Sequence, residues 1–164
     1  MSIKYCSSVI CVKEMQKSRQ FYEGLLGQKV ELDHGECVGF IGGFSLWQED
    51  HASRILFGRD GAIRFMHDDH RGEMYFETDD LDGALAIVSR SGARFVHDLV
   101  EQPWGQRVFR VYDPDGHIVE IGEPVNAVIK RFLKLGMTIE EVAQRTSMPP
   151  ETVKAAADEI HSPW

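Results

Sequence analysis

The stretch that decides the fold is PWGQRVFRVYDPDGHIVEI, residues 103–121. Two apolar runs, residues 107–112 and 117–121, flank the tetrapeptide DPDG at 113–116. Proline at the second position and glycine at the fourth favour a type I turn. The sequence therefore predicts two strands joined by a turn that is mainly structural. His117 follows this turn directly, and we expect it at the outer face of the second strand rather than as a metal ligand.

Outward from this stretch, strand and helix patterns occur twice in the same order. Met15 and Leu81, the first residues of the two predicted helices, lie 66 positions apart. The glycines that follow these helices, Gly27 and Gly92, lie 65 positions apart. Strand–helix units are common enough to coincide by chance, but an internal repeat explains the spacing best. The predicted strands are 5–12, 28–33, 37–41, 44–48, 73–78, 94–98, 107–112 and 117–121, and the predicted helices are 15–26 and 81–91.

Two details of this prediction concern helix packing and the central loop. In the helix over 15–26, the face expected to pack contains Met15, Arg19, Tyr22, Leu25 and Leu26. Between the two repeats we expect a polar loop that includes 58–62 and 67–72. Its histidines, His67 and His70, are expected to be solvated rather than to collect a cation.

Composition excludes several classes of protein. The chain has 164 residues, 43% of them hydrophobic and 27% charged, which suits one globular domain with an appendage. No apolar run is long enough for a membrane span, and we expect no signal peptide at the N-terminus. The net charge of −8 opposes binding to nucleic acid. All of it belongs to residues 1–124, because residues 125–164 carry five basic and five acidic side chains.

The three cysteines favour thiols in a reducing compartment, and hence a cytoplasmic protein. Cys6 and Cys11 are an odd number of residues apart in one predicted strand, so they face opposite ways and cannot pair. Cys37 lies elsewhere, and the set has no CxxC spacing. We expect them to be buried as small apolar side chains.

Two stretches carry a family resemblance: SRQFYEGLLGQKVEL at 18–32 and the opening stretch at 103–121. Both resemble the vicinal oxygen chelate superfamily, which includes glyoxalase I, extradiol dioxygenases and the fosfomycin- and bleomycin-resistance proteins. The resemblance implies an α+β fold of paired βαβββ modules, whose eight strands curl around a cleft, and a homodimer. It covers residues 1–123, with modules at about 1–66 and 67–123, and leaves 124–164 as a helical extension.

The resemblance also implies where a metal would bind. The family's ligands come from the first and last strands of each module, which matches Ser7, Glu73 and Glu120, with Trp47 or Gln48 at the remaining position. Serine departs from the usual histidine and is a poor ligand for zinc or nickel. The oxygen-rich remainder is Glu73, Glu120 and, as further candidates, Gln48 and Ser7. It suits Mg²⁺, Mn²⁺ or Ca²⁺ better than Zn²⁺, with Ni²⁺ also a candidate. The alternative is a metal-free polar cleft in which the two glutamates bind a ligand or pair with an arginine.

Other residues are candidates for binding a substrate. Arg110 lies in mid-strand, where it could neutralise Glu120 or bind an anionic group through two hydrogen bonds. Trp47, Trp104, Phe44 and Tyr75 could line an apolar pocket or simply pack in the core.

The sequence of the C-terminal extension predicts three helices. Residues 125–135 are amphipathic, Thr138 and Glu141 have the spacing of a capping box before a helix over 139–146, and Pro149–Pro150 open a helix to about residue 160. The last two resemble a helix-turn-helix. The final helix carries Glu151, Lys154, Asp158 and Glu159, a net charge of −2, which opposes DNA binding. We therefore expect a helical cap or self-association element, with a ligand-responsive regulator as the lesser alternative.

The function that these features favour is a glyoxalase-like small-molecule enzyme of the lyase or isomerase type. Glu73 and Glu120 are the expected catalytic residues, and Ser7, Trp47, Tyr75, Trp104 and Arg110 the expected substrate contacts. A divalent metal would polarise substrate oxygens while a carboxylate moves a proton. The alternative is a protein of the bleomycin-resistance type that sequesters a small molecule without converting it.

Overall fold

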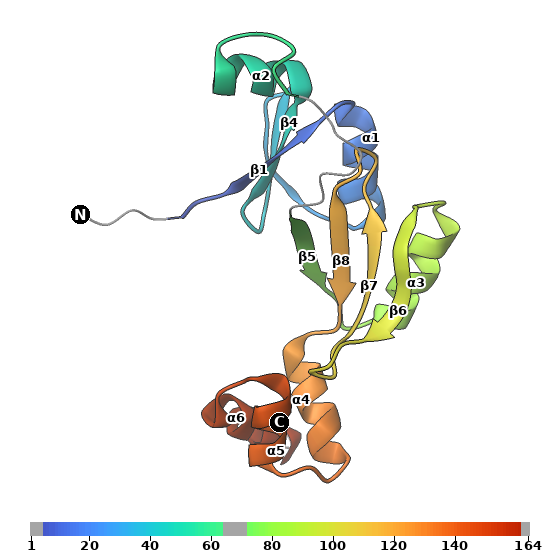
Figure 1. Cartoon of the computed structure of the whole chain (residues 1–164), viewed down its shortest axis with the longest axis vertical. Helices are drawn as coiled ribbons and strands as arrows, with labels where there is room; N and C mark the ends of the chain where they lie inside the picture. Colours follow the sequence, from blue (N-terminus) through green and yellow to red (C-terminus); the bar gives the residue numbers. More distant parts are fainter. Residues whose placement is uncertain (1–4, 64–71, 162–164) are drawn as a thin grey trace, which may run out of the picture. The chain divides into compact units, whose positions relative to one another are not determined.

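The computed structural model describes residues 5–63 and 72–161. Its contacts divide the chain into two compact units: residues 1–72 with 112–117, and residues 73–111 with 118–164. Each unit contains one four-stranded mixed sheet (Figure 1). The eight predicted strands and the α+β class are therefore confirmed, and the strands are distributed over two sheets.

The two sheets have the same topology, which confirms the internal repeat. In each, the first strand pairs in parallel with the fourth, and the third lies between the fourth and the second. Parallel pairing requires a crossover, which a helix supplies in each repeat. The first sheet contains β1 (Ser8–Val12), β2 (Val30–Asp33), β3 (Cys37–Phe40) and β4 (Phe44–Gln48). The second contains β5 (Glu73–Glu77), β6 (Phe95–Glu101), β7 (Arg107–Tyr112) and β8 (Ile118–Gly122).

The helix of the first repeat differs from the sequence prediction. It begins as α1 (Met15–Arg19) and continues as a π-helix, η1 (Gln20–Leu25). Ser18 of α1 and Phe21 and Tyr22 of η1 are the buried residues, and within η1 the wider turn shifts the side chains around the axis. Of the predicted packing face, Tyr22 is fully buried, and Met15, Arg19, Leu25 and Leu26 are partly buried.

A second difference is a helix directly after β4. Residues Glu49–Phe57 form α2, where a polar loop was expected. Glu49 and Asp50 occupy its first turn, where carboxylates favour the positive end of the helix dipole, and Gly58 ends it with φ of 68°. His67 and His70 lie outside the described residues.

The DPDG turn is more than a joint between β7 and β8. Asp113 is 5% exposed, and its carboxylate accepts hydrogen bonds from the hydroxyl of Tyr22 (2.9 Å), the backbone N–H of Asp115 (2.9 Å), and the backbone N–H (2.8 Å) and Nδ1 (2.9 Å) of His117. The side chain of Asp115 in turn accepts from Lys13 N and from Ser18 Oγ, both at 3.1 Å. This network ties the turn to the first helix.

The network perturbs the ionisation of its members. Burial opposes protonation of His117, but the hydrogen bond to Asp113 and the nearby carboxylates outweigh burial and raise the pKa of the imidazole. Burial also raises the pKa of Asp115 and, together with Asp113, the pKa of the Tyr22 hydroxyl. His117 thus stays in the turn as a partner of Asp113, half-buried rather than on the outer face of the strand.

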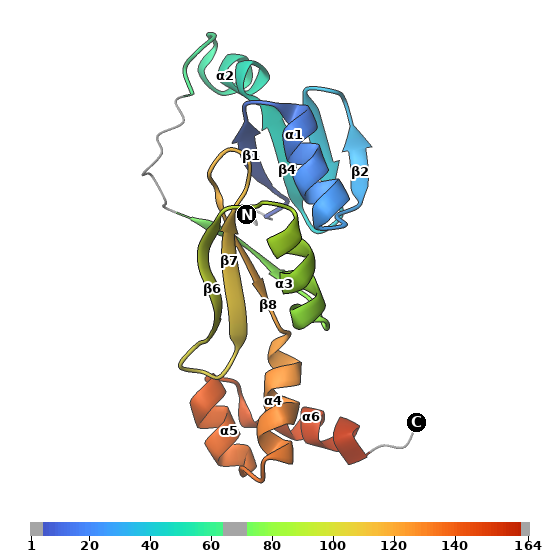
Figure 2. The same cartoon turned by 90° about the vertical axis from the view of Figure 1, so that its right-hand side faces the viewer.

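The second unit adds α3 (Leu81–Arg90) to its sheet, followed at the end of β8 by three helices (Figure 2). These are α4 (Val125–Lys134), α5 (Ile139–Thr146) and α6 (Pro150–His161), close to the predicted boundaries. The capping box of Thr138 and Glu141 is present. Every helix in the described part of the chain is too short or too polar to cross a bilayer.

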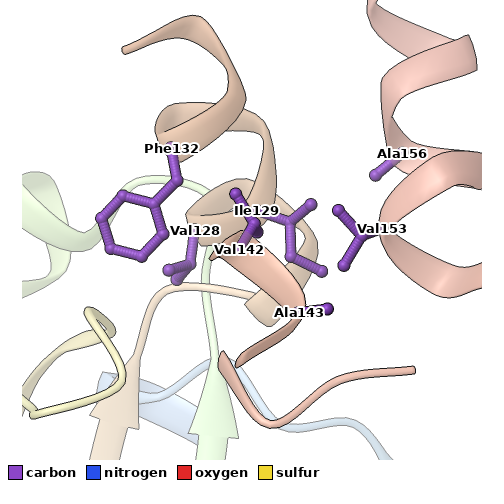
Figure 3. Close-up of a cluster of buried hydrophobic side chains, with 7 residues drawn as sticks. All are labelled: Val128, Ile129, Phe132, Val142, Ala143, Val153 and Ala156. Atoms are coloured by element: carbon purple, nitrogen blue, oxygen red, sulfur yellow. The ribbon is translucent and has the colours of Figure 1, made fainter. Parts of the chain in front are cut away.

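The three C-terminal helices share a core of their own. Its buried side chains are Val128, Ile129, Phe132, Val142, Ala143, Val153 and Ala156 (Figure 3). Since apolar residues recur at helical spacing in all three segments, this packing follows from the amphipathic pattern of the sequence. We call residues 125–161 the helical unit below.

Candidate functional site

The open face of the second sheet carries a group of polar side chains. On the face covered by α3, Val119, Ile121 and Phe109 are buried. The opposite face presents Glu73, Tyr75 and Glu77 on β5. Because Tyr75 pairs directly with Glu120 in the parallel β5–β8 ladder, these residues share a face. We call this surface the open face.

Arg110 is at the centre of a charged cluster on the open face. Its Nε donates to Glu73 Oε2 at 2.7 Å, its Nη1 lies 3.0 Å from His97 Nε2, and its Nη2 forms an ion pair with Glu120. The side chain of Arg110 is 21% exposed and that of Glu120 is 8% exposed. The arginine therefore neutralises Glu120, one of the two roles that the sequence suggested for it.

Glu120 is a buried carboxylate with perturbed ionisation. Burial raises its pKa, and the nearby Glu73 adds to this effect, while Arg110 opposes it without cancelling it. The hydrogen bond to Glu73 raises the pKa of Arg110, so the guanidinium keeps its charge. A carboxylate with a raised pKa beside a fixed cation can accept and return a proton.

A chain of hydrogen bonds continues the open face beyond this cluster. Trp104 Nε1 donates to Gln106 Oε1 at 3.0 Å, and Gln106 Nε2 donates to the hydroxyl of Tyr75 at 2.6 Å. That hydroxyl donates to Glu77 Oε1 at 2.7 Å. Gln106 is buried, whereas Tyr75 and Trp104 are 45% and 39% exposed. The rings of Tyr75 and Trp104 are thus exposed to solvent, while these hydrogen bonds hold their polar atoms in place.

Gly122 allows these side chains to approach the backbone of β8. A Cβ atom at this position would lie 3.0 Å from Val108 Cγ1 and 3.2 Å from both Gln106 Nε2 and the Tyr75 ring. A larger residue here would require Val108, Gln106 and Tyr75 to shift by a few tenths of an ångström.

The donor set on the open face does not fit a divalent cation. Glu73 and Glu120 each direct a carboxylate oxygen to Arg110, whose positive charge would repel a metal ion bound between them. Among residues 5–63 and 72–161, no three His, Cys, Asp or Glu side chains are grouped to hold a metal. Gln48 accepts from Met15 N at 3.0 Å and donates to the carbonyl of Lys13, so both ends of its amide are engaged by backbone.

The structure brings together five of the predicted site residues: Glu73, Tyr75, Trp104, Arg110 and Glu120. The other predicted residues belong to the first unit. Ser7 precedes β1 and donates to the carbonyl of Ser8, and Trp47 on β4 makes an edge-to-face contact with the ring of His51. The roles of Ser7, Trp47 and Gln48 in a site stay predictions. Phe44 stacks on Phe40 with centroids 4.6 Å apart and is a core residue.

Three residues of the open face were not in the predicted site. Gln106 shares a strand face with Arg110 by simple alternation, and Glu77 follows Tyr75 by two positions, so the sequence contained a signal for both. His97 was not recognisable, because its position opposite Arg110 depends on irregularities in the β6–β7 register.

The cysteines agree with the expectation of thiols, since Cys6, Cys11 and Cys37 are not joined in disulfides. Cys6 is exposed and the other two are partly buried, so the prediction of full burial was wrong. Burial is the main cause that raises the pKa of the Cys11 thiol, which does not favour a nucleophile.

Comparisons with known proteins agree with this architecture. No curated protein sequence matches the chain. A crystallised protein of unknown function from Agrobacterium tumefaciens str. C58 is 31% identical, with a TM-score of 0.69 over 76% of this chain and 96% of that one. A lactoylglutathione lyase from Agrobacterium tumefaciens is 22% identical, with a TM-score of 0.55 over 72% of this chain and 91% of that one.

A glyoxalase/bleomycin resistance protein/dioxygenase from Nocardioides has a similar fold, at 18% identity and a TM-score of 0.58 over 75% of this chain and 84% of that one. The family model of the glyoxalase-like domain matches residues 5–126. That match covers both βαβββ repeats and every residue of the open face. The chain therefore belongs to the glyoxalase-like domain family, within the vicinal oxygen chelate superfamily.

Proposed function

We propose that the chain is a small-molecule enzyme of the lyase or isomerase type in which Glu120 transfers a proton on the open face. The observation that carries this proposal is the buried Glu120 carboxylate, whose pKa is raised although it pairs with Arg110. An arginine partner by itself would lower the pKa of a carboxylate, but burial of Glu120 outweighs this effect and leaves a group suited to accept and release a proton.

The neighbours of Glu120 supply the other parts of this chemistry. Glu120 would remove a proton from a carbon next to a substrate carbonyl. The C–H electron pair would form a C=C bond, and the carbonyl π pair would move onto the oxygen. A guanidinium has five N–H donors, more than the three contacts of Arg110 use, and could stabilise that oxygen. In a hydroxy ketone, return of the proton to the former carbonyl carbon, with the hydroxyl proton moving to the former carbonyl oxygen, gives isomerisation. In a substrate with a leaving group on the next carbon, departure of that group with its bonding electron pair gives elimination.

Exchange of substrate protons with D2O tests this role directly. We expect the wild-type protein to accelerate loss of the C–H proton signal from members of a panel of α-hydroxy ketones and the methylglyoxal–glutathione hemithioacetal, followed by proton NMR. Glu120→Gln keeps the size of the side chain but removes the base, so exchange should fall by about 100-fold or more. Glu31→Gln makes the same change on exposed β2 and should exchange like wild type. Equal rates in wild type and Glu120→Gln would contradict the proposal.

A second candidate function is sequestration without turnover. It is favoured by the exposed rings of Tyr75 and Trp104 beside a cluster in which two glutamates face one arginine. Such a surface suits a ligand with an apolar body and a positive group. Thermal stabilisation by a panel member without any exchange would favour this function over the enzyme.

We further propose that residues 1–123 form the ligand-binding domain of a cytoplasmic homodimer, with 124–164 as its extension. The thiol state of Cys11 and Cys37 supports the compartment. The final helix carries more acidic than basic side chains, which supports a role for the extension in packing or self-association rather than in binding DNA.

A further inference from the structure

The loop between β6 and β7 supplies two members of the open face. Residues 102–106 form a tight connection, in which Gln102 N donates to Gln106 O at 2.8 Å and Gly105 N donates to Gln102 O at 2.7 Å. This loop carries Trp104 and Gln106, whose side chains continue to Tyr75. The position of the loop therefore determines where the aromatic part of the open face lies.

The helical unit contacts this loop through two adjacent residues of α4. Phe132 occupies the space beside Gly105, because a Cβ atom built there would overlap the phenyl ring. Gly105 also has φ of 89°, a conformation that side chains with a Cβ rarely adopt. Arg131 Nη2 donates to the carbonyl of Gly105 at 2.6 Å. The loop is thus held from the side by a ring and by a hydrogen bond.

Glu123, which directly follows β8, contacts both the loop 102–106 and α4. It is buried, and its carboxylate accepts from the backbone N–H of Arg107 at 3.1 Å and from Arg131 Nη2 at 2.5 Å. Its carbonyl accepts from Gln106 Nε2 at 2.8 Å. Burial opposes ionisation, but these donors outweigh it and lower the pKa of Glu123. One charged residue therefore contacts the open face through Gln106 and the helical unit through Arg131.

The helical unit packs its own core behind the residues that contact the loop. Phe132 lies at the opposite end of its buried cluster from Val153 and Ala156 (Figure 3). Arg145 of α5 stacks over the Phe132 ring, 4.3 Å from its centroid, and pairs with Glu101 of β6 at 3.2 Å. Two helices thus fix the ring that contacts Gly105.

We propose that the helical unit positions the ligand-contacting loop 102–106, with Arg131 and Phe132 as positioning residues, so that the C-terminal extension is a functional part of the open face. The importance of this loop for a ligand rests on the proposed function. By linkage, a ligand that orders Trp104 and Gln106 also stabilises the contacts of Arg131 and Phe132.

Fluorescence of Trp104 tests this proposal in the full chain without any ligand. The double substitution Trp47→Phe and Trp164→Phe leaves Trp104 as the sole tryptophan. In this parent, Arg131→Met and Phe132→Leu should each shift the Trp104 emission to longer wavelength and increase quenching by acrylamide, with the helical circular dichroism unchanged. Arg131→Lys keeps the charge and should restore part of the parent emission.

Lys130→Met is the matched control, because Lys130 precedes Arg131 on α4 but pairs with Glu159 inside the helical unit, at 2.7 Å. It should leave the emission of Trp104 as in the parent. Unchanged emission in both Arg131→Met and Phe132→Leu would overturn the proposal. So would an equal change in Lys130→Met, or loss of the helical signal in both test variants, since either result would assign these residues to stability alone. Failure of the proton-exchange test would leave this readout unaffected.

Discussion

Replacement of Arg110 by methionine is expected to lower the free energy of unfolding at neutral pH by about 3 kcal/mol, because it leaves a buried carboxylate without its counter-ion. Arg110 forms ion pairs with both Glu73 and Glu120, and methionine preserves most of the aliphatic stem. The loss should shrink as the pH falls, because without the arginine the pKa of Glu120 rises further and the neutral acid forms at higher pH.

Urea unfolding across pH 4–8 measures this effect. Arg90→Met removes the same charge from the exposed last turn of α3 and should change stability by less than about 0.5 kcal/mol. Combining Arg110→Met with Glu120→Gln should recover much of the lost stability, since no buried charge remains. If Arg110→Met were as stable as Arg90→Met at neutral pH, the pairing with Glu120 would have no energetic importance.

Replacement of Asp113 by alanine is expected to have the largest effect, a loss of about 4 kcal/mol or more, because several hydrogen bonds to one buried charge disappear together. The hydroxyl of Tyr22, a residue with no solvent exposure, and two backbone N–H groups would lose the carboxylate that accepts from them. An alanine side chain has no acceptor to offer these donors, so the DPDG turn would lose this attachment to η1.

Thermal and urea unfolding of Asp113→Ala test this expectation, with Asp158→Ala on exposed α6 as the control for removal of one carboxylate. Asp113→Asn retains one carbonyl oxygen for the backbone donors and should fall between the two. A stability of Asp113→Ala within about 1 kcal/mol of the control would show that the hydrogen bonds of Asp113 do not hold the turn in place.

Arg110 and Asp113 show what the sequence could and could not predict. Strand alternation and the spacing of the repeat predicted both sheets, because side chains on a strand must alternate and the two halves use the same order. Alternation also placed Arg110 and Glu120 on candidate faces. The multiple hydrogen bonds of Asp113 could not be predicted, because its partner Tyr22 lies 91 positions away and its orientation depends on a π-helix without a sequence signal.

The remaining differences have similar physical causes. His97 meets Arg110 only because the β6–β7 pairing is irregular, and bulges are set by local packing rather than by residue type. The contact of Phe132 with Gly105 joins an amphipathic helix to a loop 27 positions earlier. Amphipathic patterns identify which face is buried, but not the surface that covers it.

The measurement that tests the central claim most directly is the pKa of Glu120, followed by carbon-13 NMR of its side-chain carboxyl through a pH titration. We predict a value above the ordinary 4.5 of a glutamate, because burial outweighs Arg110. A raised folded-state pKa also means that the stability of wild type relative to Glu120→Gln is greatest below pH 4.5 and falls as the pH rises through the folded pKa. A pKa of Glu120 below 4.5 would make the residue a structural ion-pair partner and contradict its proposed role in proton transfer.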